Sequence, residues 1–289
     1  MILVTGASGS VGSAVLREVL NSGKPASAMY RSREDAAKSS GGSPTRVADF
    51  ADKPSLRRAL DGVETVYLVC SPIRELVDLE SSMIDACREG GVHYVVLNSA
   101  LGAGDYPKSF PSWHRKVEEK LKASGLAYAI LRPNSFMQNM QTYYASSIRS
   151  QGAFYVAMEN ARISFIDVRD LARVAAKMLT SPEHQGQTYE LNGPEALTYG
   201  EVADKISRVT GRKVRYVDIP EEAQRKSMLE LGMPEWQVTA LLDLQAYYTG
   251  GKGADVDDTL PKLLGQSPRT MDQFLAEFAA DFAEQRATA

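Results

Sequence analysis

Three glycines near the start of the chain constrain its fold more than any other feature. Gly6 and Gly9 lie between an apolar run, Ile2 to Val4, and a helical pattern, Val11 to Leu20, and Gly12 is the second residue of that pattern. Because glycine has no Cβ, it allows a sharp turn out of a strand, a close approach of the backbone to a pyrophosphate, and tight packing of the helix on a sheet. The N–H groups at the positive end of the helix then face the phosphates. The spacing predicts a dinucleotide-binding turn.

The first half of the chain alternates between short β-branched apolar runs and helical patterns. Its six candidate strands are Ile2 to Val4, Ala26 to Tyr30, Arg46 to Ala48, Thr65 to Val69, Tyr94 to Leu97 and Tyr128 to Leu131. The helical patterns between them include Val11 to Leu20, Leu76 to Glu89 and Ser112 to Lys122. Consecutive βαβ units build a parallel sheet through right-handed crossovers. We predict an α/β fold, a Rossmann-type doubly wound parallel sheet with helices on both faces, with residues 1–150 as the NAD(P)-binding domain.

The second half is less regular. Strand-like and helical segments follow one another unevenly at Ala153 to Ala157, Ile163 to Ile166, Arg169 to Leu179, Thr188 to Leu191, Tyr199 to Thr210 and Met271 to Phe282. We expect residues 151–289 to form mainly a smaller substrate-binding lobe, with segments that return to the Rossmann sheet. Ser39 to Ser43 and Gly250 to Gly253 are expected to be loops.

Composition excludes several classes of function. The net charge of −3 over 289 residues provides no basic field for nucleic acid. Cys70 and Cys87 lack metal-ligand spacing, and three histidines do not suggest a metal site. A strand directly after Met1 leaves no room for a signal peptide, and no run approaches the roughly 20 apolar residues of a membrane span. We therefore expect a cytoplasmic protein with no metal, membrane or nucleic-acid partner.

The end of the second strand indicates which dinucleotide is bound. An NAD-selective site usually has an acidic residue about twenty residues after the glycines. Here Arg31, Ser32 and Arg33 follow the strand instead. Because a guanidinium can bind a 2′-phosphate through paired hydrogen bonds, we predict NADPH over NADH, with Arg31 as the main contact, Ser32 second and Arg33 third. The alternative is a solvated basic loop that pairs with Glu34 and Asp35.

Two further segments supply candidate cofactor contacts. In the glycine turn, Ser8 and Ser10 offer hydroxyl donors and Val11 offers a backbone N–H. After the third strand, Asp49 could hydrogen-bond the adenine and Phe50 could cover it. Local capping of the loop competes with this interpretation of Asp49 and Phe50.

Three stretches together resemble one family. Gly6 to Gly12, Trp113 to Asn139 and Ile163 to Ala172 are similar to the NmrA-like branch of the atypical short-chain dehydrogenase/reductases. Members of that branch include NADPH-dependent quinone, azo-dye and triphenylmethane reductases, isoflavone-type reductases, and cofactor-sensing regulators. The resemblance covers nearly the whole chain and specifies fold and cofactor better than substrate.

The resemblance also identifies catalytic candidates. Ordinary superfamily members use a Tyr-x-x-x-Lys pair, and alignment puts Phe110 at the tyrosine and His114 at the lysine. His114 is therefore expected to bind the nicotinamide ribose or to pass on a proton, and to pair with Glu118 one turn later. Ser99 takes the place where the superfamily often has a catalytic serine. The alternatives are a locally paired surface histidine and a serine that caps a strand end.

Further site residues follow from the resemblance. The remaining cofactor contacts are expected at strand ends, at Cys70, Ser71, Pro72, Asn98, Ser99, Pro133, Asn134, Ser135 and Phe136. An aromatic or apolar substrate surface is expected from Tyr106, Phe136, Met137, Tyr143 and Trp236. Ordinary core packing competes with the substrate role for each of these five.

The leading functional hypothesis is an oxidoreductase that transfers a hydride from NADPH to a small, flat, conjugated acceptor such as a quinone or azo compound. Quinone reduction does not require a strong proton donor, which suits the absence of the usual tyrosine. A carbonyl or double-bond reductase of the isoflavone type is weaker, because that subgroup has lysine where His114 stands. The competing class is an NADP(H)-sensing regulator without turnover that acts on a partner protein. A homodimer is left open.

Overall fold

The computed structural model describes residues 1–38 and 43–284, and it divides into two compact units. Unit 1 consists of Met1–Pro133 and Val168–Leu191, and unit 2 consists of Asn134–Asp167 and Asn192–Ala289. The division thus falls at Pro133 rather than at residue 150, because the segment after Pro133 packs with later parts of unit 2. The expected loop Ser39 to Ser43 lies outside the described residues except for Ser43.

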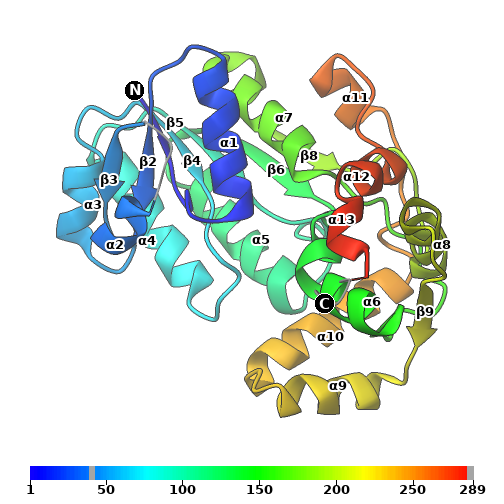
Figure 1. The fold of residues 1–289 in the computed structure, drawn as a ribbon. Helices are drawn as coiled ribbons and strands as arrows, with labels where there is room; N and C mark the ends of the chain where they lie inside the picture. The colour runs from blue at the N-terminus through cyan, green and yellow to red at the C-terminus, as the bar shows by residue number, and fades with distance from the viewer. Residues whose placement is uncertain (39–42, 285–289) are drawn as a thin grey trace. The chain divides into compact units, whose positions relative to one another are not determined.

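Unit 1 is built on a parallel sheet of seven strands in the order β3-β2-β1-β4-β5-β6-β8 (Figure 1). The strands are β1 Ile2–Val4, β2 Ala26–Tyr30, β3 Thr45–Val47, β4 Thr65–Leu68, β5 Tyr94–Asn98, β6 Ala127–Pro133 and β8 Gln187–Leu191. The order reverses between β1 and β4, so the carboxyl ends of these neighbours form the switch point where ligands of such sheets bind. The predicted Rossmann-type fold is confirmed.

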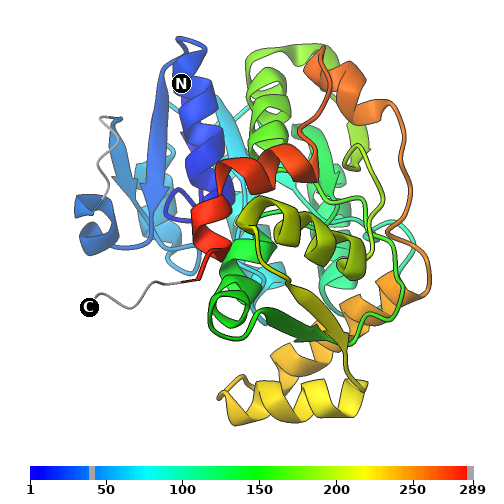
Figure 2. The same cartoon turned by 45° about the vertical axis from the view of Figure 1, so that its right-hand side comes forward.

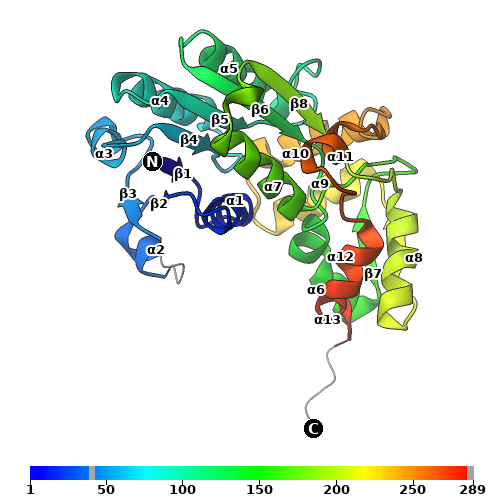
Figure 3. The same ribbon diagram turned by 90° about the horizontal axis from the view of Figure 1, so that it is seen from above.

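Helices cover both faces of this sheet. The helices α1 (Ser10–Asn21) and α7 (Val168–Thr180) pack together on one face, while α3 (Lys53–Ala59), α4 (Leu76–Glu89) and α5 (Ser109–Lys122) lie on the other (Figure 3). A core of fully buried strand residues such as Leu3, Val66 and Val95 packs against Leu56 and Met83 of these helices. Each such side chain contributes about 1.5–3 kcal/mol by burial, which fixes the sheet that carries the site.

Local chemistry explains where one of these helices begins. The sequence predicted a start at Ser112, after Pro111, but α5 begins at Ser109. Proline is tolerated in the first turn of a helix because the N–H groups there have no partner within the helix. The extra turn brings Phe110 and Pro111 into the helix, where both are buried.

Unit 2 contains a two-stranded parallel sheet, β7 (Ala153–Val156) with β9 (Arg215–Asp218) (Figure 2). An aromatic cluster that includes Tyr144, Phe154 and Tyr199 packs beside this sheet, with ring centroids 5.2–5.8 Å apart. The α-helices of unit 2 are α6 Ala145–Gln151, α8 Tyr199–Thr210, α9 Glu221–Glu230, α10 Glu235–Thr249, α11 Thr259–Leu264, α12 Met271–Glu277 and α13 Ala279–Phe282. Short non-α helical turns occur at Met140–Tyr144 in unit 2 and at Pro182–His184 in unit 1.

Two segments of unit 2 differ from prediction. Ile163 to Ile166 forms only isolated bridges, with Leu197 and Phe136, because its apolar side chains are buried by packing rather than by a strand ladder. The expected helix Met271 to Phe282 is divided, because Phe278 leaves the helical backbone at φ −107° and stacks on Phe274. No helix in the described ranges is both long and apolar enough to cross a bilayer.

Candidate cofactor site

The glycine turn follows β1 and excludes a Cβ at Gly6 and Gly12. Gly6 has φ +57°, and a Cβ there would lie 2.9 Å from Val69 Cγ1. The Gly9 N–H donates a hydrogen bond to the Gly6 carbonyl oxygen at 2.9 Å. A Cβ on Gly12 would overlap that same carbonyl oxygen. The turn therefore leads directly into α1, whose first turn contains no acidic side chain and offers its N–H groups to an anion.

Thr5 holds this turn against the neighbouring strand end. Its backbone N–H donates to the Tyr67 carbonyl oxygen at 3.0 Å, and its Oγ1 accepts a hydrogen bond from the Val69 N–H at 2.9 Å. The side chain is fully buried. The sequence analysis missed Thr5, although a polar residue at the end of an apolar strand and directly before Gly6 could have suggested a fastening role.

A pocket of about 330 Å³ opens beside the turn, within the volume range of small-molecule sites, about 300–1,000 Å³. Seven of the predicted cofactor residues line it, namely Gly6, Ser8, Arg31, Asp49, Phe50, Cys70 and Ser71. Seven further lining residues were not predicted, namely Met29, Tyr30, Asp35, Ala48, Val69, Ile73 and Leu79. Because these residues come mostly from the ends of β1, β2, β3 and β4, the pocket lies at the switch point of the sheet.

The Cys70 thiol in the wall of this pocket is uncharged at neutral pH. Burial is the main reason that its pKa is raised to about 12, and the nearby charge of Glu80 acts in the same direction. The charge of Arg31 lowers this pKa and that of Asp49 raises it. Both charged side chains are therefore close enough to act on the thiol. Cys70 provides a neutral surface rather than a nucleophile.

The loop after β2 shows which side chains are free to meet a ligand. Ser32 Oγ accepts a hydrogen bond from the Asp35 N–H at 3.0 Å and donates to Asp35 Oδ2 at 2.8 Å, so it caps the helix α2 (Arg33–Ala37). Arg31 is exposed and lines the pocket. Ser32 and Arg33 are not among the residues that line it. Glu34 pairs with Lys38 at 2.7 Å rather than with an arginine.

Asp49 makes a local hydrogen bond and also lines the pocket. Its Oδ1 accepts a hydrogen bond from the Ala51 N–H at 2.9 Å, as the loop-capping alternative predicted. The neighbouring Phe50 is half-buried and packs against the sheet core. Both nevertheless line the pocket. Their contact with adenine stays a prediction.

The end of β5 does not present a free serine hydroxyl. Ser99 is 2% exposed and donates a hydrogen bond to Glu118 Oε1 at 2.6 Å. Asn98 accepts a hydrogen bond from the Tyr67 hydroxyl at 3.0 Å. The proton of Ser99 is thus held by a buried carboxylate on α5 rather than by a loop, and the catalytic role of Ser99 stays a prediction.

A buried ion pair at this point was missed by the sequence analysis. Arg132 donates from Nε to Glu118 Oε1 at 2.9 Å and from Nη2 to Glu118 Oε2 at 2.7 Å. Burial alone would raise the pKa of Glu118, but hydrogen bonds from Arg132 and Ser99 outweigh it, and the pKa lies below its ordinary value. The ion pair joins α5 to β6, and the hydrogen bond from Ser99 adds the residue that follows β5.

His114 is buried and neutral. It is 8% exposed, and in the described part of the chain its Nδ1 has no hydrogen-bond partner. Burial lowers its pKa to about 4, although the charge of Glu118 acts in the opposite direction. The predicted hydrogen-bonded pair with Glu118 is not formed, because Ser99 and Arg132 occupy that carboxylate. Phe110, at the position of the missing tyrosine, packs edge-on against Trp113 at 5.1 Å.

At the start of unit 2, the predicted cofactor residue Asn134 makes hydrogen bonds within that unit. Asn134 Nδ2 donates to Asn192 Oδ1 and to the Gly253 carbonyl oxygen, both at 3.0 Å, and Asn134 Oδ1 accepts from the Ser135 N–H at 2.8 Å. Both N–H donors of its amide are thus used within the protein. Pro133, the last residue of β6, is buried. The cofactor roles of Pro133 to Phe136 stay predictions.

The predicted substrate residues differ in exposure. Met137 is fully buried in the core, which is the packing alternative, while Phe136 is half-buried beside it in unit 2. Tyr143 is 68% exposed, and Trp236 is half-buried on α10. Tyr106 belongs to unit 1, where its carbonyl oxygen accepts a hydrogen bond from Arg115 at 3.3 Å. Their roles stay predictions.

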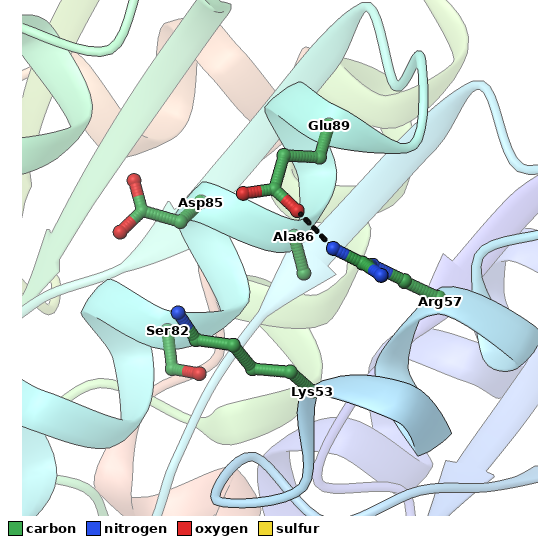
Figure 4. A pocket seen from close by; sticks show the side chains of 6 residues that line it. All are labelled: Lys53, Arg57, Ser82, Asp85, Ala86 and Glu89. Atoms are coloured by element: carbon green, nitrogen blue, oxygen red, sulfur yellow. Dashed lines mark hydrogen bonds and ion pairs between the residues drawn. The ribbon is translucent and has the colours of Figure 1, made fainter.

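A second hollow lies between α3 and α4 and is too small for an organic ligand. It is lined by Lys53, Arg57, Ser82, Asp85, Ala86 and Glu89, and an ion pair of 3.2 Å joins Arg57 to Glu89 (Figure 4). Its volume of about 10 Å³ holds roughly one water molecule. Within the described ranges, no group of three His, Cys, Asp or Glu side chains could hold a metal ion.

The sheet order, the glycine turn and the pocket at the switch point define a dinucleotide-binding protein of the Rossmann class. A model of the NmrA-like family matches residues 1–275. The chain belongs to the NmrA-like family, as the resemblance predicted.

Characterised relatives match over almost their full lengths. The NAD(P)H azoreductase of Xenophilus azovorans is 36% identical over 287 residues, which cover 98% of this chain and 99% of the relative. Quinone oxidoreductase 2 of Escherichia coli strain K12 is 28% identical over 278 residues, which cover 94% of this chain and 96% of the relative. The solved NADPH complex of an Escherichia coli NADPH-dependent quinone oxidoreductase superposes with a TM-score of 0.87 at 27% identity, covering 96% of this chain and 99% of that chain.

Proposed function

We propose that this protein is an NADPH-dependent reductase that transfers a hydride to a flat conjugated acceptor, a quinone or an azo compound. The observation that carries the proposal is the pocket at the switch point, which joins the glycine turn to the exposed guanidinium of Arg31. The names of the azoreductase and quinone oxidoreductase relatives support the same class of reaction.

The residues present fit this cofactor. The first N–H groups of α1 and the close approach that Gly12 allows suit a pyrophosphate. Arg31 suits a 2′-phosphate, and the apolar side chains of Met29 and Phe50 suit the adenine. The buried Nδ1 of His114, which lacks a protein partner in the described chain, suits a ribose hydroxyl. Buried polar atoms are rarely left unpaired, so this orphan atom favours a ligand.

The side chains of the site orient reactants rather than supply protons. When bound, NADPH supplies the hydride. His114 is neutral at pH 7, because burial lowers its pKa to about 4, so it offers a hydrogen bond but not a readily released proton. Phe110 has no hydroxyl, and the hydroxyl proton of Ser99 is held by Glu118. Catalysis must therefore come mainly from proximity and alignment.

This chemistry favours particular acceptors. A quinone or azo compound delocalises the negative charge that it gains, and water can protonate the product. An isolated aldehyde concentrates that charge on one oxygen and requires a donor at the moment of transfer. The absence of a hydroxyl at Phe110 therefore favours the conjugated class.

The test is NADPH oxidation, followed by absorbance, with a panel of quinones, azo dyes, aldehydes and enones and with NADH as the second cofactor. We expect oxidation that depends on quinones or azo dyes and is much slower with aldehydes. Tight NADPH binding without oxidation by any acceptor would instead support the cofactor-sensing regulator and overturn the reductase.

The acceptor is proposed to contact Phe136, Tyr143 and Trp236, which expose aromatic surface in unit 2. Replacing Trp236 by Ala is expected to raise KM for the acceptor and to leave KM for NADPH unchanged. The matched control is Leu231→Ala, because Leu231 is 84% exposed and has no proposed contact with the acceptor.

A further inference from the structure

Two opposite charges share the wall of the cofactor pocket. Arg31 follows β2, Asp35 lies in the first turn of α2, and both line the pocket. The proposed function uses Arg31 for the extra phosphate of NADPH and gives Asp35 no role. An acid at this place opposes a 2′-phosphate, because like charges repel.

Ser32 holds the Asp35 carboxylate in place through one of its two oxygens. Ser32 Oγ donates to Oδ2 at 2.8 Å and accepts from the Asp35 N–H at 3.0 Å. This reciprocal pair fixes the side chain at the start of α2. In residues 1–38 and 43–284, no second hydrogen bond to the carboxylate is formed, so Oδ1 can accept a hydroxyl group of a ligand.

The pocket wall carries more negative than positive charge. It contains one guanidinium, Arg31, and two carboxylates, Asp35 and Asp49. One oxygen of Asp49 accepts a hydrogen bond from the Ala51 N–H, but the negative charge of Asp49 still raises the pKa of the Cys70 thiol. A ligand that brings a dianionic phosphate meets more repulsion on this wall than one that brings a hydroxyl.

We propose that Asp35 is a specificity-determining residue that reduces the preference for NADPH over NADH. Its charge repels the 2′-phosphate of NADPH, and its Oδ1 accepts a hydrogen bond from the 2′-hydroxyl of NADH. Arg31 still favours NADPH, so the protein uses both cofactors with a moderate preference for the phosphorylated one. This inference rests on the proposed function, since it concerns the same pocket.

The test compares the affinities of the full chain for the two cofactors. The dissociation constants of NADPH and NADH are measured by calorimetry for the wild type, Asp35→Asn and Asp35→Ala. Asparagine preserves the size of the side chain and can still accept from Ser32. We expect the ratio Kd(NADH)/Kd(NADPH) to rise about fivefold in both variants. A change of this size is at the upper end of the effect that one partly exposed charge pair has on an equilibrium. The rise should shrink at high salt, because ions screen the repulsion.

The matched control is Glu34→Gln. Glu34 is adjacent in sequence and equally charged, but its side chain is 78% exposed, pairs with Lys38 and does not line the pocket. Its removal should leave the ratio of dissociation constants unchanged.

The outcomes separate this inference from the proposed function. Equal losses of both affinities in the two Asp35 variants would mean that Asp35 only holds α2 and would overturn the inference. Affinities for both cofactors that stayed unchanged in the two variants would also overturn it. If the wild type bound neither cofactor, the proposed function itself would fail, and the inference with it.

Discussion

Replacing Glu118 by Gln tests whether one buried ion pair holds α5 on β6 in unit 1. The Glu118 side chain is 2% exposed and Arg132 is 14% exposed, and two hydrogen bonds of 2.9 and 2.7 Å join them. In the variant, an amide NH₂ group would face the guanidinium donors, and Arg132 would keep only its ion pair with the exposed Glu190 at 3.3 Å. Removing one partner of a buried pair costs about 3–5 kcal/mol, and because Gln keeps one acceptor we expect about 3 kcal/mol of unfolding free energy to be lost.

The measurement is urea unfolding of the wild type, Glu118→Gln and a control, Glu119→Gln. Glu119 is the next residue on α5 and is exposed, so its replacement should change the unfolding free energy by less than about 0.5 kcal/mol. A double-mutant cycle with Arg132→Gln isolates the coupling between the two side chains. A loss below about 1 kcal/mol in Glu118→Gln, or a coupling near zero, would refute the claim that this pair holds α5 and β6 together.

The same pair predicts a dependence on pH. The folded-state pKa of Glu118 is lowered from its ordinary value of 4.5, so its contribution is present above that value and is lost as the pH falls below it. The difference in stability between wild type and Glu118→Gln should therefore narrow below pH 4.5. A difference that stayed constant through the acid range would contradict the assigned cause.

Four further predictions address other parts of the site. Gly12→Ala should lose about 1–3 kcal/mol of stability and most cofactor affinity, because its Cβ would overlap a backbone oxygen, whereas the control Gly200→Ala, with no atom nearer than 3.7 Å, should be neutral or stabilising. Arg31→Ala should weaken NADPH binding much more than NADH binding, and equal losses would exclude its role at the 2′-phosphate. The rate of acceptor reduction should show no titration of His114 between about pH 6 and 8, since burial lowers its pKa to about 4, and an inflection near 6.5 that His114→Gln abolished would oppose this. Burial raises the pKa of Glu80 to about 8, so unfolding experiments should show stability falling from about pH 5 to 8 in the wild type but not in Glu80→Gln, and parallel profiles would contradict it.

The sequence predicted the framework of the cofactor site well, because local rules determine it. The spacing of Gly6, Gly9 and Gly12 reports a turn in which neighbouring atoms exclude a Cβ at Gly6 and Gly12, and that constraint is visible within one short segment. The α4 helix was predicted with its observed bounds because its apolar periodicity is uninterrupted. The α/β alternation likewise led directly to the parallel sheet.

Interactions between distant segments could not be predicted in the same way. The partner of Glu118 is Arg132, which lies on another element, and local spacing suggested His114 instead. Ser32 was expected to contact phosphate, but its hydroxyl is engaged by Asp35 three residues later. Apolar composition at Ile163 to Ile166 suggested a strand, whereas packing alone buries these side chains. In each case the choice among several chemically reasonable partners depends on the tertiary structure.

The discontinuous composition of unit 1 has a consequence during synthesis. β6 gains its outer neighbour only when β8 pairs with it, from Ala129 opposite Gln187 to Pro133 opposite Leu191. A nascent chain that has emerged only to residue 150 therefore exposes one edge of β6, and bare strand edges recruit other chains. The sheet is therefore complete only after residue 191 has left the ribosome. A fragment that ends at residue 150 should aggregate rather than form a minimal cofactor-binding domain.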